Sequence, residues 1–198
     1  MEVGAIEANV EAIFEQTGAV LKGHFLLTSG LHSPVYWEKF RVLHFPQYTR
    51  QLCRLISENF TGCDIDVVAG PTTGGIILAH EVGRQMQLPA LYAENAGDDR
   101  RCFRRGLGVT PGQKVLIVDD ILTTGKSIRQ VIELVKEQGG LVAGIGVLVN
   151  RSEQEHDFSA PLFSCLRSVT PVYKPDECPL CANGIPLTKP GGSQPVTQ

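Results

Sequence analysis

Apolar residues recur at helical spacing in two stretches near the start of the chain. The first precedes Gly18 and the second follows Pro46; their apolar positions are Ile6, Val10, Ile13 and Phe14, then Tyr48, Leu52, Leu55 and Ile56. Intervals of three and four residues place such side chains on one face of a helix, and a proline suits a first turn. The pattern therefore predicts two surface helices.

Residues 25–40, between these helices, alternate aromatic and aliphatic side chains with the turn residues Ser29-Gly30 and Ser33-Pro34. This alternation predicts short strands joined by a turn. With part of the C-terminal region, residues 1–45 are expected to form a small hood beside the main sheet.

From Ile65 onward, short apolar runs alternate with amphipathic stretches. In chain order the predicted elements are a strand at 65–69, a helix at 75–86, strands at 90–93 and 115–118, a helix at 126–138 and a strand at 142–149. Strands that alternate with helices form parallel βαβ units. The sequence thus predicts an α/β domain over residues 1–174, with a parallel sheet flanked by helices.

Two polar segments do not follow this alternation of strands and helices. Residues 94–112 are long, polar and glycine-bearing, and a loop of this length in a compact domain is usually functional, for example as a lid. Residues 175–198 form a tail rich in Pro and Gly, and its end, 189–198, has too few apolar residues to bury and is expected to be disordered.

Length and charge limit the class of protein. The 198 residues suit one domain, and a net charge of −3 creates no general attraction for nucleic acid. No apolar run approaches bilayer length, and acids stand near the N-terminus where a secretory signal would be basic. We expect a cytoplasmic protein with neither nucleic acid nor membrane as a partner.

The six cysteines are expected to be reduced, since four are scattered through packed α/β segments. Cys178 and Cys181 have metal-ligand spacing, but a closed zinc site needs two more ligands, and no second CxxC motif or nearby pair of histidines accompanies them. Loop structure is expected there, with a local disulfide as an option.

The most specific chemistry follows the apolar run 115–118. Asp119 and Asp120 come next, then the turn Thr123-Thr124-Gly125-Lys126-Ser127, which opens the helix predicted at 126–138. Ligands of open α/β sheets bind at the carboxyl ends of strands, and a helix start attracts phosphate. Two carboxylates can hold vicinal hydroxyls or waters of a magnesium ion. This combination suits a ribose 5-phosphate.

Two simpler interpretations compete with a sugar phosphate site. A nucleotide-binding P-loop needs a glycine where Asp120 stands. An ordinary capped turn accounts for Thr124 or Ser127 singly, but not for paired acids with three hydroxyls.

Residues 115–128 resemble the phosphoribosyl pyrophosphate motif of the type I phosphoribosyltransferases. Other segments resemble the orotate phosphoribosyltransferases in particular: residues 23–30 (GHFLLTSG), 32–36 (HSPVY), 70–75 (GPTTGG) and Asn150-Arg151. The resemblance implies a type I phosphoribosyltransferase fold that works as a homodimer. It also implies Mg²⁺ as cofactor, held mainly by substrate and water, with Asp119 and Asp120 as optional ligands.

The resemblance assigns expected roles to individual residues. Asp119, Asp120, Arg100, Arg101 and Arg104 are the candidate catalytic residues, with the arginines closing over a pyrophosphate leaving group. The candidate substrate-binding residues are Thr28, Tyr36, Trp37, Thr72, Thr73, Gly74, Ile121, Leu122, Thr123, Thr124, Gly125, Lys126, Ser127 and Arg151. Core packing is the alternative for the two aromatic residues, and solvent exposure is the alternative for the arginines.

Three positions bear on the substrate. Arg151 could pair with the carboxylate of orotate. The family frequently has a lysine where Gly74 stands, and a basic residue where Glu94-Asn95 stands. The implied reaction is transfer of the phosphoribosyl group from phosphoribosyl pyrophosphate to orotate. The alternatives are another base as acceptor, or a regulatory protein that binds phosphoribosyl pyrophosphate without turnover.

Overall fold

The structure is a computed structural model that describes residues 3–27 and 29–190. Six strands form the main sheet in the order β5-β4-β3-β6-β7-β8, parallel throughout except for β5. Its strands are β3 (Val67–Pro71), β4 (Ala90–Gly97), β5 (Arg100–Cys102), β6 (Lys114–Leu122), β7 (Leu141–Asn150) and β8 (Leu162–Arg167). The helices are α1 (Val3–Gln16), α2 (Phe40–Leu43), α3 (Pro46–Asn59), α4 (Gly74–Met86), α5 (Lys126–Glu137) and α6 (Pro179–Ala182), with a 3₁₀ turn, η1 (Pro175–Glu177).

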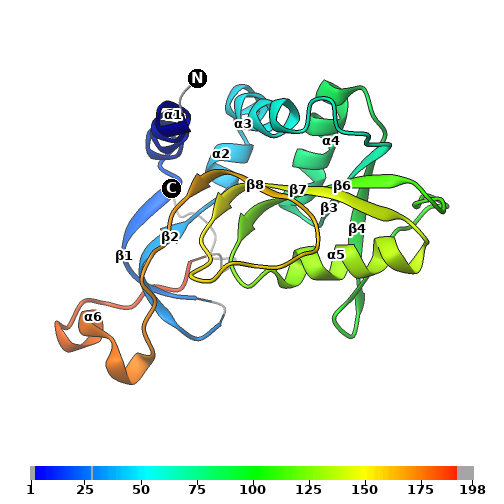
Figure 1. Ribbon diagram of the computed structural model, residues 1–198. Coiled ribbons are helices and arrows are strands. Elements are labelled where there is room, and N and C mark those ends of the chain that lie inside the picture. The colour runs from blue at the N-terminus through cyan, green and yellow to red at the C-terminus, as the bar shows by residue number, and fades with distance from the viewer. Residues whose placement is uncertain (1–2, 28, 191–198) are drawn as a thin grey trace.

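The sheet separates two apolar cores because side chains alternate across each strand. Leu116 and Val118 of β6 join a core with α1, α3 and α4, whereas Val115 and Ile117 join a second core with α5. Figure 1 shows α5 on one face of the sheet and α3 and α4 on the other. This three-layer arrangement explains why β6 is apolar on both faces.

The order of the strands reverses between β3 and β6. After β3 the chain adds β4 and then β5 on one side; β6, β7 and β8 follow on the other side. Ligands of open α/β sheets bind at the carboxyl ends of strands beside such a reversal. Residues 71–74 and 119–127 meet there, which places both sequence motifs at one edge of the sheet.

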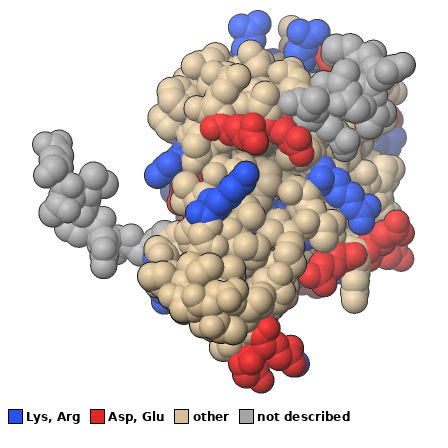
Figure 2. All heavy atoms as spheres, turned by 90° about the vertical axis from the view of Figure 1, so that its left-hand side faces the viewer, with Lys and Arg blue, Asp and Glu red and all other residues tan. Residues whose placement is uncertain are grey.

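A second, two-stranded sheet forms from β1 (Val20–Leu26) and β2 (His32–Trp37), which pair antiparallel. The C-terminal segment flanks both strands: Thr188 bridges to Phe25 and Tyr173 bridges to His32. Both chain ends therefore build this lobe, as Figure 1 shows for the blue hairpin and the orange α6 segment. On its outer face, acidic and basic side chains are separated by uncharged residues (Figure 2).

The predicted helices and most predicted strands are confirmed within a few residues, and the departures have physical reasons. β6 continues through Asp119 and Asp120 to Leu122, because its pairing with β7 extends to Leu122 and Asn150. Residues 94–112 are not wholly loop, since β4 runs to Gly97 and turns into β5. The edge strand β8 was not predicted, because it is short and lies between the turn residues Pro161 and Ser168.

Other expectations concern the termini and the cysteines. The structure describes all six cysteines as free thiols, including Cys178 and Cys181, for which a local disulfide was the option. Their reduced state in the protein stays a prediction. The expected disorder at the end of the chain falls largely on residues 191–198, outside the described residues. Among residues 3–27 and 29–190, no helix combines the length and apolar character needed to cross a bilayer.

The packing of β7 against α3 gives a stability prediction. A Cβ at Gly144 would lie 2.3 Å from Cε1 of Phe60, which is itself 2% exposed. Gly144→Ala should therefore lower the free energy of unfolding by about 1–3 kcal/mol, because overpacking forces neighbours to shift. Phe60→Leu removes the obstructing ring atoms, so the double variant should lose less than the two single losses added together. Urea unfolding of all four proteins tests this, and strict additivity would contradict the proposed contact.

Candidate functional site

Asp119 and Asp120 are adjacent, buried carboxylates near the end of β6, at 6% and 3% exposure. One oxygen of Asp119 accepts the Ser127 hydroxyl at 2.7 Å, and the other accepts the backbone N–H of Asp120 at 2.9 Å. Asp120 accepts the N–H of Ile121 at 2.7 Å and forms an ion pair with Lys39 at 3.0 Å. Both acids are therefore held by contacts with the protein itself.

The burial of this pair changes the acidity of Asp119. Desolvation, followed by the neighbouring charge of Asp120, raises the pKa of Asp119 from 3.8 to about 7. The hydrogen bond from Ser127, the N–H of Asp120 and the charge of Lys39 act in the opposite direction. Asp119 thus titrates near neutrality because two carboxylates share one dry position.

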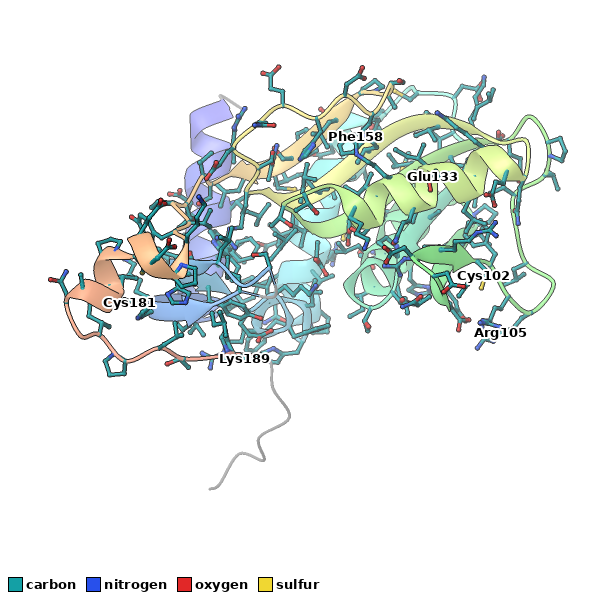
Figure 3. The ribbon with its side chains drawn as sticks, turned by 90° about the horizontal axis from the view of Figure 1, so that it is seen from below. Cys102, Arg105, Glu133, Phe158, Cys181 and Lys189 are labelled. Atoms are coloured by element: carbon teal, nitrogen blue, oxygen red, sulfur yellow. The ribbon has the colours of Figure 1, made fainter. Side chains whose placement is uncertain are left out.

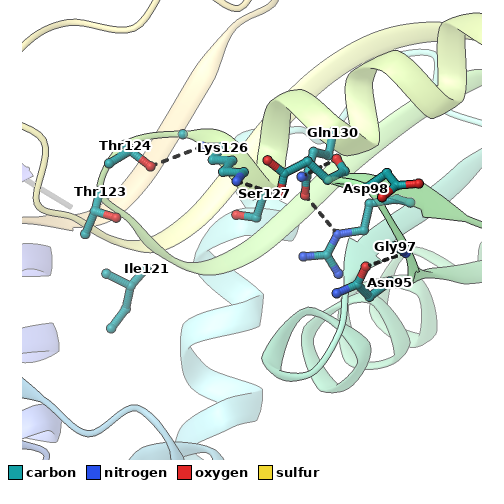
Figure 4. A pocket seen from close by; sticks show the side chains of 12 residues that line it. Asn95, Gly97, Asp98, Ile121, Thr123, Thr124, Lys126, Ser127 and Gln130 are labelled. Carbon is teal, nitrogen blue, oxygen red and sulfur yellow. Dashed lines mark hydrogen bonds and ion pairs between the residues drawn. The ribbon is translucent and has the colours of Figure 1, made fainter. Parts of the chain in front are cut away.

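The turn after β6 forms one wall of a cavity of about 510 Å³. Ile121 and residues 123–127 line it, and Figure 4 shows them facing Asn95, Gly97 and Asp98 across the opening. Gly125 precedes α5 with φ +74°, a left-handed conformation that glycine adopts without strain. The turn curls around the start of α5, whose helix dipole favours an anion such as phosphate.

The opposite wall comes from the β4–β5 hairpin. Arg101 is anchored there, since its guanidinium donates to the Thr72 hydroxyl at 2.9 Å, to Gln130 at 3.2 Å and to the carbonyl of Ala93 at 3.2 Å. Lys126 on the first wall pairs with Asp99 on the second at 2.7 Å. The cavity therefore contains two cations, one fixed by neutral groups and one paired with an acid.

Arg151 follows β7 on the other side of β6. Its backbone N–H donates to the carbonyl of Leu122 at 2.8 Å. Its Nε is buried with no hydrogen-bond partner among the described residues, and burial lowers the pKa of its guanidinium. The hydroxyl of Tyr36 lies near enough for each charge to influence the other group. A half-buried guanidinium whose Nε is an unused donor is suited to a carboxylate.

Gly74, at the start of α4, touches the acid pair. A Cβ at this position would lie 1.8 Å from Oδ2 of Asp120. A side chain of any kind, including the lysine frequent in the family, would displace Asp120 from its position in this structure. Glycine is therefore required at position 74 if Asp120 is to keep its position.

The structure separates some predicted site residues from the cavity. Arg100 pairs with Glu137 and Arg104 with Glu94, both away from the cavity lining.

Trp37 packs edge-on against Phe14, with ring centroids 5.1 Å apart, in keeping with its core-packing alternative. Leu122 is 1% exposed, so its side chain belongs to the core. Asp119, Asp120, Thr72, Thr73 and Gly74 do not line the cavity, but Asp119 contacts Ser127 and Thr72 contacts Arg101, both of which do. Thr28 lies outside the described residues.

Several site residues were missed by sequence reasoning. Lys39 reaches Asp120 from 81 positions earlier in the chain, and a single lysine after a strand carries no local signal of such a pair. Gln130, Asp98 and Asp99 also line the cavity. Gln130 could have been found, because it lies one helical turn after Lys126 on the same face of α5.

Comparisons with known proteins agree with this arrangement. The family model for the phosphoribosyl transferase domain matches residues 46–174. The orotate phosphoribosyltransferase of Caldanaerobacter subterraneus subsp. tengcongensis is 46% identical over 179 residues, which cover 90% of this chain and 94% of that protein. That of Pelotomaculum thermopropionicum is 45% identical over 182 residues, covering 92% and 95%.

Among solved structures, that of orotate phosphoribosyltransferase from Aeropyrum pernix matches with a TM-score of 0.66 at 26% identity, covering 80% of this chain and 93% of that one. The fold and the family model together define a phosphoribosyltransferase domain. By its identity to full-length relatives, the chain belongs to the orotate phosphoribosyltransferase family. The resemblance and the fold class predicted from the sequence are confirmed.

The raised pKa of Asp119 predicts how stability depends on pH. A carboxyl whose pKa is higher in the folded protein binds more protons there, so its contribution to stability falls as pH rises from about 4 to about 7. Asp119→Asn removes this loss. In magnesium-free buffer, the variant should gain stability relative to the native protein between pH 5 and pH 8, by a few kcal/mol at roughly 1.4 kcal/mol per pKa unit.

Denaturant unfolding at the two pH values measures this difference. Asp64→Asn, which changes an exposed acid, provides the baseline. A difference between Asp119→Asn and the native protein that is no more pH-dependent than this baseline would contradict the raised pKa.

Proposed function

We propose that this protein transfers the 5-phosphoribosyl group from phosphoribosyl pyrophosphate to orotate, giving orotidine 5-monophosphate and pyrophosphate. The observation that carries the proposal is the combination of the turn 123–127 at the start of α5 with Arg151 on the other side of β6. One offers an anion site for the 5-phosphate, and the other offers an unused donor for the carboxylate of orotate.

The reaction needs no protein nucleophile. A ring nitrogen of orotate attacks the anomeric carbon and gives up its proton to water or pyrophosphate as the bond to pyrophosphate breaks, so negative charge accumulates on the leaving group. Arg101 is anchored at the cavity wall and is the arginine best placed to stabilise that charge. Lys126 can add a second positive charge if the ligand displaces Asp99 from it.

Magnesium is part of the proposal. It prefers oxygen ligands and keeps several waters, and the carboxylates of Asp119 and Asp120 fit this chemistry. Because Ser127, Lys39 and backbone N–H groups already occupy these oxygens, we assign Asp119 and Asp120 to orient water and ribose hydroxyls around the ion. When bound, Mg²⁺ would neutralise pyrophosphate charge. The homodimer and the cytoplasmic location expected from the sequence also belong to this proposal.

Another base as acceptor is the second candidate. A neutral base such as uracil or adenine would leave Arg151 without a carboxylate, and its buried Nε donor would stay unpaired, which is costly. The third candidate is a regulatory protein that binds phosphoribosyl pyrophosphate without turnover. Its support is Glu94, which stands where the family has a basic residue and which pairs here with Arg104 and Arg105.

A steady-state assay with orotate, uracil and adenine distinguishes the three candidates. Orotate should be the preferred acceptor. Arg151→Gln should lower kcat/KM for orotate by roughly 10- to 150-fold, the equivalent of a charged hydrogen bond of about 1.5–3 kcal/mol. Arg167→Gln, at an exposed position ending β8, is the matched control. Preference for a neutral base would support the second candidate, and binding without turnover would support the third.

The acid pair gives a separate prediction. Asp119→Asn combined with Asp120→Asn should remove most activity because the ribose hydroxyls and the magnesium waters lose their acceptors. Circular dichroism should show the native fold, since asparagine is nearly isosteric with aspartate. Asp64→Asn should retain activity. Full turnover by the double variant would refute the role of the acids.

A further inference from the structure

Four side chains that suit a metal ion converge in the lobe formed by β1, β2 and the C-terminal segment, away from the cavity. His24 of β1, His32 of β2, Cys178 and Cys181 place their ligand atoms within 4.8 Å of one another. The two cysteines follow the histidines by about 150 residues in the chain. Figure 3 shows Cys181 at one end of the molecule and Cys102 and Arg105 of the β4–β5 region at the other.

Four of the six distances between these atoms are close to those of a tetrahedral site, and all six are within 4.8 Å. Sulfur and nitrogen ligands of one tetrahedral zinc ion lie about 3.5 Å apart, from bond lengths of about 2.3 and 2.0–2.1 Å. Here Sγ of Cys178 lies 3.5 Å from Nε2 of His24, and Sγ of Cys181 lies 3.3 Å from Nδ1 of His32 and 3.8 Å from Nε2 of His24. The two nitrogens are 2.9 Å apart, compared with about 3.3 Å in such a site.

The surroundings fix which nitrogen of His24 is free to bind. Its Nδ1 lies 2.7 Å from the carbonyl oxygen of Ile185, which can only accept a hydrogen bond. Nδ1 therefore carries the proton, and in the neutral ring the lone pair is on Nε2, the atom that faces the other three ligands. Histidines that bind metals commonly donate their second nitrogen to a carbonyl in this way.

We propose that His24, His32, Cys178 and Cys181 bind one zinc ion, which fastens the C-terminal segment to the β1–β2 hairpin. Two thiolates and two imidazoles in tetrahedral array favour zinc over magnesium, which takes oxygen ligands. Two thiolates also balance the charge of the ion in a place where His24, His32 and Cys178 are buried. Because all four positions are taken by protein, the site is structural and leaves none for substrate.

The segment that carries the cysteines has little else to hold it in place. Of the three large apolar side chains between Tyr173 and Thr188, Leu180 is half-buried, and Ile185 and Leu187 are 41% and 46% exposed. Backbone pairing fixes the two ends: His32 and Tyr173 exchange hydrogen bonds at 2.8 and 2.9 Å, and Thr188 bonds to Leu26 and His24 at 2.9 and 2.8 Å. Zinc would supply the cross-link in the middle that a small apolar core would otherwise provide.

Metal content of the full chain tests the site independently of the proposed activity. The protein is produced with zinc, purified under reducing conditions without chelator and dialysed against magnesium. Elemental analysis should find about one zinc per chain, and Cys181→Ser and His32→Asn should lose most of it. Cys63→Ser, which changes another exposed free cysteine, should keep it.

A second measurement covers variants that fail to fold. Chelator-treated native protein is reloaded with Co²⁺, which should give the absorption of a tetrahedral thiolate complex. Hydrogen exchange at Leu26, His32, Tyr173 and Thr188 should accelerate on metal removal, while β6 stays protected. Zinc content below roughly a tenth of an ion per chain would overturn the proposal. So would undiminished zinc in both variants, or a Cys178–Cys181 disulfide in the purified protein.

Discussion

The burial of two adjacent carboxylates at the end of β6 is the constraint on which the rest of the site depends. Asp119 and Asp120 are almost fully buried, so protein groups must replace much of their hydration, and three separate elements surround the pair. Ser127 at the start of α5 donates to Asp119, Lys39 after β2 pairs with Asp120, and Gly74 at the start of α4 leaves space for Asp120. Through these contacts, one acid pair links α4, α5 and the segment that follows β2.

In this arrangement the acids lie next to the proposed anion site but do not line its cavity. A carboxylate that lined the phosphate pocket would repel the ligand, whereas one beneath the wall can orient the turn through Ser127 and remain paired. The cations show the same division. The hydrogen bonds that hold Arg101 go to neutral oxygens, whereas Lys126, Arg100 and Arg104 are paired with acids. Ligand binding at the proposed site would consequently require exchange of the ion pair between Lys126 and Asp99 as well as new contacts.

The sequence predicted those features that depend on local pattern. The buried strand, the acids and the hydroxyl-rich turn fall within fourteen consecutive residues, and the structure places that turn at a cavity. Features that depend on distant residues could not be read in this way. Lys39 is one example, and the pairing of Arg100 and Arg104 with acids is another, since charge content alone does not reveal which partners a loop folds against. Extension of β6 through Asp119 and Asp120 was missed because acids usually end a buried strand.

The pair Cys178 and Cys181 illustrates the same limit more sharply. Near them the sequence offers no further ligand, so the spacing alone favoured a loop. The missing partners are eight residues apart on neighbouring strands, where the β1–β2 pairing and the flanking Tyr173 and Thr188 bring them to the cysteines. His32 shares β2 with Tyr36, whose hydroxyl lies close enough to Arg151 to influence its pKa. A cross-link at His32 would therefore act on the same strand that borders the proposed orotate site. Zinc binding by the C-terminal segment would in this way affect the position of β2 beside that site.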